Sequence, residues 1–114
     1  MNYRFIFTAW FDRDLKLLGK HNSGLRSDLE TFLREFDPIV HPVIPGSGGA
    51  RKARMQAKGR GKRGGYRVVY YFFDGDTVWL ITMYDKVRKE DLAPTEAKEI
   101  NRLIDEIKKR GSSS

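Results

Sequence analysis

The segment Tyr66 to Phe73 most restricts the fold, because every residue in it except Arg67 is apolar or aromatic. A strand with apolar side chains on both faces belongs at the centre of a sheet. The sequence Asp74-Gly75-Asp76 follows at once and is typical of a hairpin turn, and the apolar residues 78–84 predict the returning strand. The sequence therefore predicts a hairpin that lies inside a sheet.

The remaining segments alternate between strand and helix patterns. Residues 3–8 are rich in β-branched and aromatic side chains and predict a first strand, and residues 51–56 predict a half-exposed second strand. Apolar residues at helical spacing predict helices over residues 10–18, 25–36 and 95–110, the second with a capping box of Ser27 and Glu30. The predicted order is β-α-α-β-β-β-α, an α+β fold with helices on a mostly antiparallel sheet.

The length of 114 residues suits a single domain. We expect residues 1–111 to form it and residues 112–114, all serine, to be a disordered tail. The chain has no cysteine, which excludes disulfides and thiolate chemistry. The apolar run from Phe5 to Phe11 is too short for a signal peptide or a membrane span, so we expect a cytoplasmic protein.

Positive charge is concentrated between Pro38 and Phe73, where eight basic residues occur without one Asp or Glu. The other 14 of the 22 basic residues are opposed by 15 acidic ones, so the net charge of +7 arises within this segment. A local excess of cations attracts polyanions such as nucleic acid, and such binding weakens as salt rises. The absence of acids nearby favours polyanion binding over local ion pairing.

Several other kinds of site find little support. His21 and His41 fall in expected loops, far from any carboxylate pair, so ordinary surface positions are a better interpretation than metal ligation or acid–base catalysis. Residues 59–64 have the spacing of the dinucleotide-binding fingerprint, but a strand follows where that motif opens a helix. Neither a metal nor a nucleotide cofactor is expected.

Four cations can converge on one anionic site. Lys52 and Arg54 are two residues apart on one predicted strand, so their side chains share a face. Arg67 interrupts the apolar central strand, where a charge is costly unless it reaches a partner or the edge of a cleft. Lys86 lies just past the end of the next strand, two residues beyond Tyr84.

Three blocks of the sequence, residues 48–54, 58–72 and 80–86, resemble the RelE/HigB family of type II toxin-antitoxin systems, closest to its HigB-like branch. The likeness is collinear from Gly46 to Lys109, and the first 45 residues match only in their strand-helix-helix pattern. The resemblance implies a fold similar to microbial ribonucleases. It also implies a bacterial toxin that cleaves messenger RNA in the ribosomal A site, and an antitoxin that often carries a helix-turn-helix DNA-binding domain.

The resemblance also implies which residues are catalytic. Its cations fall on Lys52, Arg54, Arg67 and Lys86. The tyrosine of many relatives falls on Leu92, which makes Tyr84 the nearest aromatic substitute. Such a site has the RNA 2′-hydroxyl attack the adjacent phosphate without a metal. A lysine serves as the base where neighbouring cations and desolvation favour its neutral form, and Arg54 and Arg67 are such neighbours of Lys52.

A second set of residues is expected to bind RNA and the ribosome. The loop over residues 58–65 contains four glycines and is too mobile to hold a reacting phosphate, so its cations should supply affinity. An aromatic side chain at the start of the central strand can stack on a base. The set comprises Arg51, Lys58, Arg60, Lys62, Arg63 and Tyr66.

Two alternative functions remain open. Residues 63–70 faintly resemble the aromatic strand of the RNA recognition motif, which would suit a non-catalytic RNA-binding module, although two helices precede the second strand. A DNA-binding protein needs a recognition helix with clustered Arg and Asn, whereas the helix over residues 95–110 has interleaved acids. Measuring RNA cleavage with and without ribosomes separates these possibilities.

Overall fold

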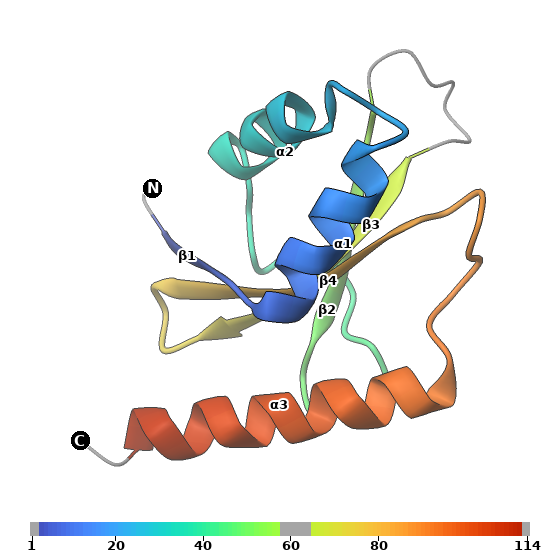
Figure 1. Cartoon of the computed structure of the whole chain (residues 1–114). Helices are drawn as coiled ribbons and strands as arrows, with labels where there is room; N and C mark the ends of the chain where they lie inside the picture. Colours follow the sequence, from blue (N-terminus) through green and yellow to red (C-terminus); the bar gives the residue numbers. More distant parts are fainter. Residues whose placement is uncertain (1–2, 58–64, 113–114) are drawn as a thin grey trace.

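The computed structural model describes residues 3–57 and 65–112. Within them the elements follow the predicted order β-α-α-β-β-β-α (Figure 1). The strands are β1 (Arg4–Phe7), β2 (Arg51–Met55), β3 (Tyr66–Phe73) and β4 (Thr77–Asp85). The helices are α1 (Ala9–Gly19), α2 (Leu25–Arg34) and α3 (Pro94–Ser112). The α+β class is confirmed, and the expected boundaries differ from these by a few residues.

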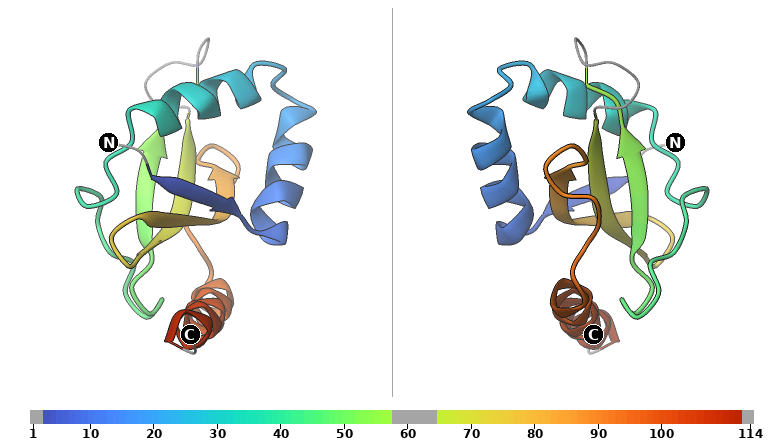
Figure 2. Two further views of the ribbon diagram at one scale, coloured as in Figure 1. Left: turned by 90° about the vertical axis from the view of Figure 1, so that its left-hand side faces the viewer. Right: turned by 90° about the vertical axis from the view of Figure 1, so that its right-hand side faces the viewer.

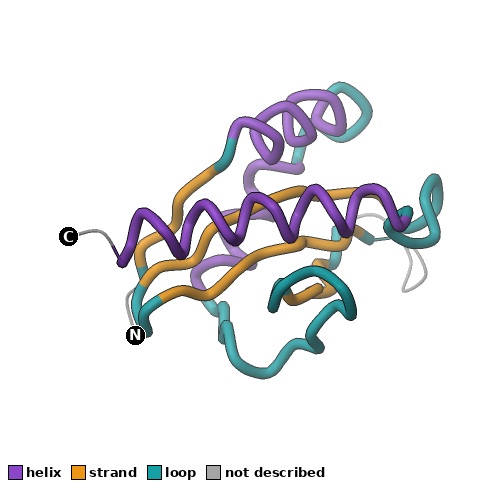
Figure 3. Tube along the Cα trace, turned by 90° about the horizontal axis from the view of Figure 1, so that it is seen from below, coloured by secondary structure: helices purple, strands orange, loops and turns teal. Residues whose placement is uncertain are grey.

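The strands form one sheet in the order β1-β4-β3-β2. β1 runs parallel to β4, and the other two pairings are antiparallel, so the prediction of a mostly antiparallel sheet is confirmed. Helices α1 and α2 lie on one side of the sheet and α3 on the other (Figure 2). From below, α3 extends over the strands of the sheet (Figure 3). The sheet is therefore the middle layer.

The predicted central position of β3 is confirmed, because its side chains pack into a hydrophobic core on each side of the sheet. Val68 and Tyr70 pack into the core that contains residues of α1 and α2. Val69 points to the other side and packs with Ile100 and Ile104 of α3. This alternation explains why almost the whole strand is apolar, since both faces bury their side chains under helices.

The predicted hairpin turn between β3 and β4 is also confirmed. Asp74 and Gly75 both have positive φ values, 59° and 80°. Two consecutive residues of this kind make the turn whose twist matches the right-handed twist of paired strands. The hairpin therefore closes directly after Phe73, which pairs with Thr77.

The starts of the helices show one wrong prediction and one feature that was not anticipated. α2 begins two residues before Ser27 and has Gly24 as its N-cap without a side-chain cap, so the capping box of Ser27 and Glu30 does not form. Ser27 and Glu30 already lie within the helix. At the start of α3, a carboxylate oxygen of Glu96 accepts a hydrogen bond from the backbone N–H of Ala93, at 2.8 Å, which is half of such a box.

None of the three described helices combines the length and the apolar character that a membrane crossing requires.

Candidate active site

The four cations expected at the site line one pocket. The pocket has a volume of about 360 Å³ and is open to solvent on one side. Its lining residues are His41, Pro42, Lys52, Arg54, Arg67 and Lys86. No acidic side chain is among these lining residues, so the pocket, named here the cation pocket, suits an anion.

Strand register brings three of these cations together. Arg54 lies opposite Arg67 in the β2–β3 pairing, and Arg67 lies opposite Tyr84 in the β3–β4 pairing. Residues directly opposite each other project from the same face of a sheet. Lys52 is on that face too, because it precedes Arg54 by two positions. This face also carries Val69, which packs under α3, while Arg67 remains half-buried at the edge of the pocket.

Arg54 and Arg67 are the cations that the fold leaves available. Neither makes a hydrogen bond or ion pair with another residue in the described ranges 3–57 and 65–112. Like charges directly opposite on neighbouring strands destabilise a sheet. A bound anion would remove that repulsion, and the two planar guanidinium groups can each donate two hydrogen bonds to a phosphate.

The two lysines of the cation pocket are held by the loop of residues 86–93 that follows β4. The Nζ atom of Lys52 lies 3.1 Å from a carboxylate oxygen of Asp91. The ammonium of Lys86 donates to the backbone oxygen of Glu90. Hydrogen bonds from the Leu92 backbone N–H and from Lys52 lower the pKa of Asp91 below its usual value. Lys52 thus has an acidic partner that is 39 residues away along the chain.

Tyr84 lies opposite Arg67 on the neighbouring strand, but it is not among the residues that line the cation pocket. Its side chain is buried, and its hydroxyl makes no hydrogen bond of ordinary geometry with a described residue. Burial, with the negative charge of Asp91 nearby, raises the pKa of Tyr84 to about 12, so the phenol is neutral near pH 7. Leu92, which occupies the position of the missing tyrosine, is half-buried and packs against the core under α3.

The structure separates the residues expected to bind RNA. Tyr66 is only 1% exposed, packs in the core with α1 and α2, and accepts a hydrogen bond from the Asn22 amide at 3.2 Å. Its ring is therefore not brought to the cation pocket. Arg51 donates to the backbone oxygens of Ile39 and His41, at 3.1 and 2.6 Å, which fastens the preceding loop to β2. The other four, Lys58, Arg60, Lys62 and Arg63, lie outside the described residues.

His41 lines the cation pocket although the sequence suggested an ordinary surface loop. Its ring packs against Phe36 and Tyr70, with centroid distances of 5.6 and 6.1 Å. Burial lowers the pKa of His41, so the imidazole is neutral near pH 7. The residues just after it run along β2, where the Lys52 backbone N–H donates to the Pro42 oxygen at 3.0 Å. The prolines and glycines of residues 38–49 leave two alternatives open, a loop or an extended edge segment, and this pairing fits the second.

Within residues 3–57 and 65–112, no group of three or more His, Cys, Asp or Glu side chains is arranged to hold a metal ion.

Comparison with known proteins bears on the fold. No family model matches the chain. A solved structure of a mutant of the E. coli toxin RelE in the free state is similar, with a TM-score of 0.52 and 24% sequence identity. The similarity covers 79% of this chain and 90% of that chain. The predicted RelE-like fold is therefore confirmed.

Proposed function

We propose that this protein is the toxin of a type II toxin-antitoxin system, of the HigB-like branch, and that it inhibits translation by cutting messenger RNA on the ribosome. One observation carries the proposal: Lys52, Arg54, Arg67 and Lys86, expected from separate parts of the chain, line one pocket. The similarity in fold to the RelE toxin supports it. The proposed partners are a cognate antitoxin, with a helix-turn-helix DNA-binding domain, and the ribosome, in the cytoplasm.

The proposed reaction is transfer of a phosphoryl group within the RNA. The 2′-hydroxyl oxygen attacks the adjacent phosphorus, the bond to the 5′-oxygen of the next nucleotide breaks, and a 2′,3′-cyclic phosphate and a 5′-hydroxyl end remain. Lys52 would take the 2′-hydroxyl proton, and Arg54 and Arg67 would hold the negative charge of the phosphorane. Lys86 would donate the proton that the leaving oxygen needs or stabilise its charge. The chemistry proposed here uses no metal ion.

The ion pair between Lys52 and Asp91 bears on this mechanism. Asp91 uses one of the three N–H donors of the Lys52 ammonium, so Lys52 can still contact a phosphate, but it can act as a base only in its neutral form. The side chain of Asp91 is 67% exposed, so this contact is weakly held and water can replace it. We infer that a phosphate entering beside Arg54 and Arg67 takes the place of Asp91.

The experiment is to incubate the purified protein with messenger RNA, with and without ribosomes, and to map the new ends. Cleavage only with ribosomes, leaving 5′-hydroxyl ends, is the expected result. Lys52→Ala and Arg67→Ala should abolish cleavage and leave the fold intact, because each removes a phosphate-directed group. Lys16→Ala is the matched control, since Lys16 is exposed on α1 and absent from the pocket lining.

A non-catalytic RNA-binding module is the second candidate. The observation in its favour is that both lysines of the cation pocket already have partners in the loop of residues 86–93, which leaves two arginines that can bind a phosphate but not abstract a proton. RNA or ribosome binding without any new 5′-hydroxyl end, and without growth arrest on expression, would favour this candidate and contradict the proposed cleavage.

A further inference from the structure

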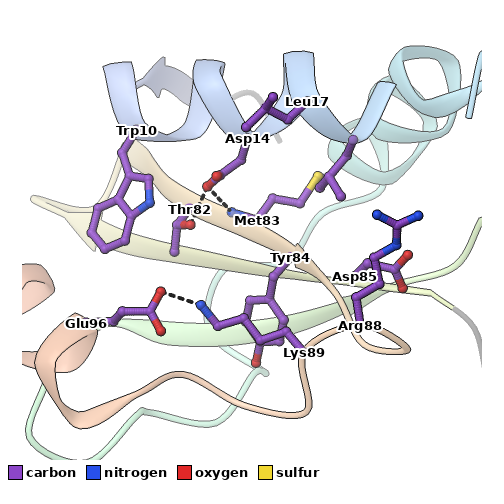
Figure 4. Close-up of a pocket in the computed structure, with 11 residues that line it drawn as sticks. Trp10, Asp14, Leu17, Thr82, Met83, Tyr84, Asp85, Arg88, Lys89 and Glu96 are labelled. Carbon is purple, nitrogen blue, oxygen red and sulfur yellow. Dashed lines mark hydrogen bonds and ion pairs between the residues drawn. The ribbon is translucent and has the colours of Figure 1, made fainter. Parts of the chain in front are cut away.

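A second pocket lies on the other side of Tyr84, between α1 and the outer edge of β4 (Figure 4). It has a volume of about 230 Å³ and is open to solvent. Trp10 and Asp14 of α1 form one wall, and Tyr84 with Lys89 forms the opposite one. This pocket is named here the aromatic pocket.

The aromatic pocket exists because β1 is short. β1 pairs with β4 only as far as Leu80, so the edge of β4 beyond that residue has no neighbouring strand among the described elements. Asp14 covers part of this edge. One of its carboxylate oxygens, Oδ2, accepts a hydrogen bond from the Met83 backbone N–H at 3.2 Å and another from the Thr82 hydroxyl.

The other carboxylate oxygen of Asp14, Oδ1, accepts no hydrogen bond from a residue of the described ranges. Asp14 is half-buried, and this burial raises the pKa of its carboxyl, which the bonds from Thr82 and Met83 only partly oppose. Asp14 lines the pocket, and a carboxylate oxygen that no described residue bonds can accept a hydrogen bond from a ligand N–H or O–H donor.

Two aromatic side chains and Lys89 form further parts of the walls, which also include Asp85, Arg88 and Glu96. Trp10 is half-buried, and Tyr84 is 6% exposed with a hydroxyl that has no hydrogen-bond partner of ordinary geometry in the described part of the chain. The ammonium of Lys89 lies 5.6 Å from the centre of the Tyr84 ring and is held by the Glu96 carboxylate. Indole and phenol rings are the side chains on which nucleobases stack in single-stranded nucleic-acid sites.

The aromatic pocket and the cation pocket are adjacent. Tyr84 lies directly opposite Arg67 in the β3–β4 pairing, and neighbouring strands are about 4.8 Å apart. A nucleotide with its phosphate at Arg67 would therefore have its base within reach of Tyr84.

We propose that the aromatic pocket binds a purine base of the RNA, that of the nucleotide whose phosphate occupies the cation pocket. The inference deepens the proposed function and rests on it for the identity of the polymer. A purine offers a two-ring surface for Trp10 and Tyr84, and guanine offers N–H donors to the free oxygen of Asp14. Bases without two fused rings would cover less of these aromatic surfaces.

The test is equilibrium binding of three small probes by calorimetry, without ribosomes: guanosine 3′-monophosphate, uridine 3′-monophosphate and inorganic phosphate. The guanosine probe should bind at least about tenfold more tightly than inorganic phosphate, which is the range expected for stacking of one base. The uridine probe should fall between them. Equal affinity for the three probes would overturn the proposal.

Two variants test whether the base occupies the aromatic pocket. Asp14→Asn keeps the shape of the side chain and an oxygen for the Met83 N–H, but presents a donor where the free acceptor was, so the guanosine preference should disappear while phosphate affinity stays the same. Trp10→Leu should reduce guanosine and uridine binding alike. If Asp14→Asn weakens guanosine and phosphate binding by the same factor, the base does not occupy this pocket.

Arg67→Ala is the matched variant of the neighbouring site. This substitution should weaken the binding of all three probes by one common factor, because it removes a phosphate contact and no base contact. The binding readout is independent of RNA cleavage. Absence of cleavage together with a guanosine preference would contradict the proposed function but not the base pocket. Cleavage without any base preference would contradict the base pocket but not the proposed function.

Discussion

Asp91 holds Lys52 from a distant part of the chain, and the exchange of this partner for a phosphate can be tested at one residue. Asp91→Asn should tighten the binding of inorganic phosphate, because it removes a negative charge that pairs with Lys52 beside the pocket. The pair is largely exposed, so the gain should be modest, up to about fivefold. Titration by calorimetry at low ionic strength measures it.

The control for this prediction is Asp105→Asn. Asp105 is exposed on α3 and is not in the lining of the cation pocket, so its change should leave phosphate affinity the same within error. A loss of phosphate affinity in Asp91→Asn would mean that Asp91 positions Lys52 for the anion instead of competing with it.

At the scale of residues, the sequence determined from which face of the sheet a side chain projects, but not which residue it contacts. Lys52 and Arg54 share a face because side chains alternate along a strand, and this was predicted. Asp91 was not found, because a salt bridge across 39 residues depends on the path of the loop after β4. Tyr66 was expected to stack on a base, but its side chain projects from the face of β3 that packs under α1 and α2.

At the scale of elements, the backbone conformation just before β3 requires a glycine. Gly65 has a φ of 152°, and a Cβ atom placed there would lie 2.9 Å from the backbone oxygen of Met55. Its own backbone oxygen accepts a hydrogen bond from the Lys86 N–H at 3.1 Å. Gly65→Ala should therefore lower the free energy of unfolding by about 1–3 kcal/mol, as measured by chemical denaturation.

Gly19→Ala provides the comparison. Gly19 is the last residue of α1, and a Cβ atom there would meet nothing within 4 Å. Alanine should leave stability unchanged or raise it by up to about 1 kcal/mol, because it favours the helix and restricts the unfolded chain. Equal effects of the two substitutions would contradict the steric explanation for Gly65.

Element order was predictable because each element has its own local pattern. The spacing of Leu25, Leu29 and Leu33 and the alternation of β3 both report which side of an element is buried. Helix ends were less predictable. Ser27 and Glu30 have the right spacing for a cap, but the hydrogen bond from the Gly24 N–H to the Asn22 side chain orders the chain earlier, and α2 begins before them.

At the scale of the whole molecule, the like charges that line the cation pocket repel one another, and a bound anion reduces this repulsion. Arg54→Gln should raise the free energy of unfolding in low-salt buffer by up to about 1 kcal/mol, because it removes one of two like charges on opposed strand positions. Inorganic phosphate should raise the melting temperature of the wild type, since a ligand that binds only the folded state stabilises it. Calorimetric scans with and without phosphate check both.

The phosphate effect should be smaller in Arg54→Gln than in the wild type. Arg102→Gln is the control, because Arg102 is exposed on α3 and its removal changes the net charge by the same amount. If both variants respond alike to phosphate, the response comes from overall charge and not from the cation pocket. A marked loss of stability in Arg54→Gln would mean that Arg54 supports the sheet.

The sequence by itself determined the element order, the α+β class, the turn at Asp74-Gly75 and the concentration of cations before and within β3. These features follow from residues close together in the chain. The set of four cations was expected from the residues themselves, and the resemblance to a known family added their catalytic roles. The fold brings the four to one pocket.

Only the tertiary structure decided which groups are neighbours there. It placed Arg54 opposite Arg67, brought Asp91 to Lys52, turned the His41 ring toward Phe36, and left the edge of β4 open beside Tyr84. Each of these depends on the register between strands or on the path of a loop. Register and loop paths are set by packing across the whole molecule, because many residues far apart in sequence must bury their surfaces together.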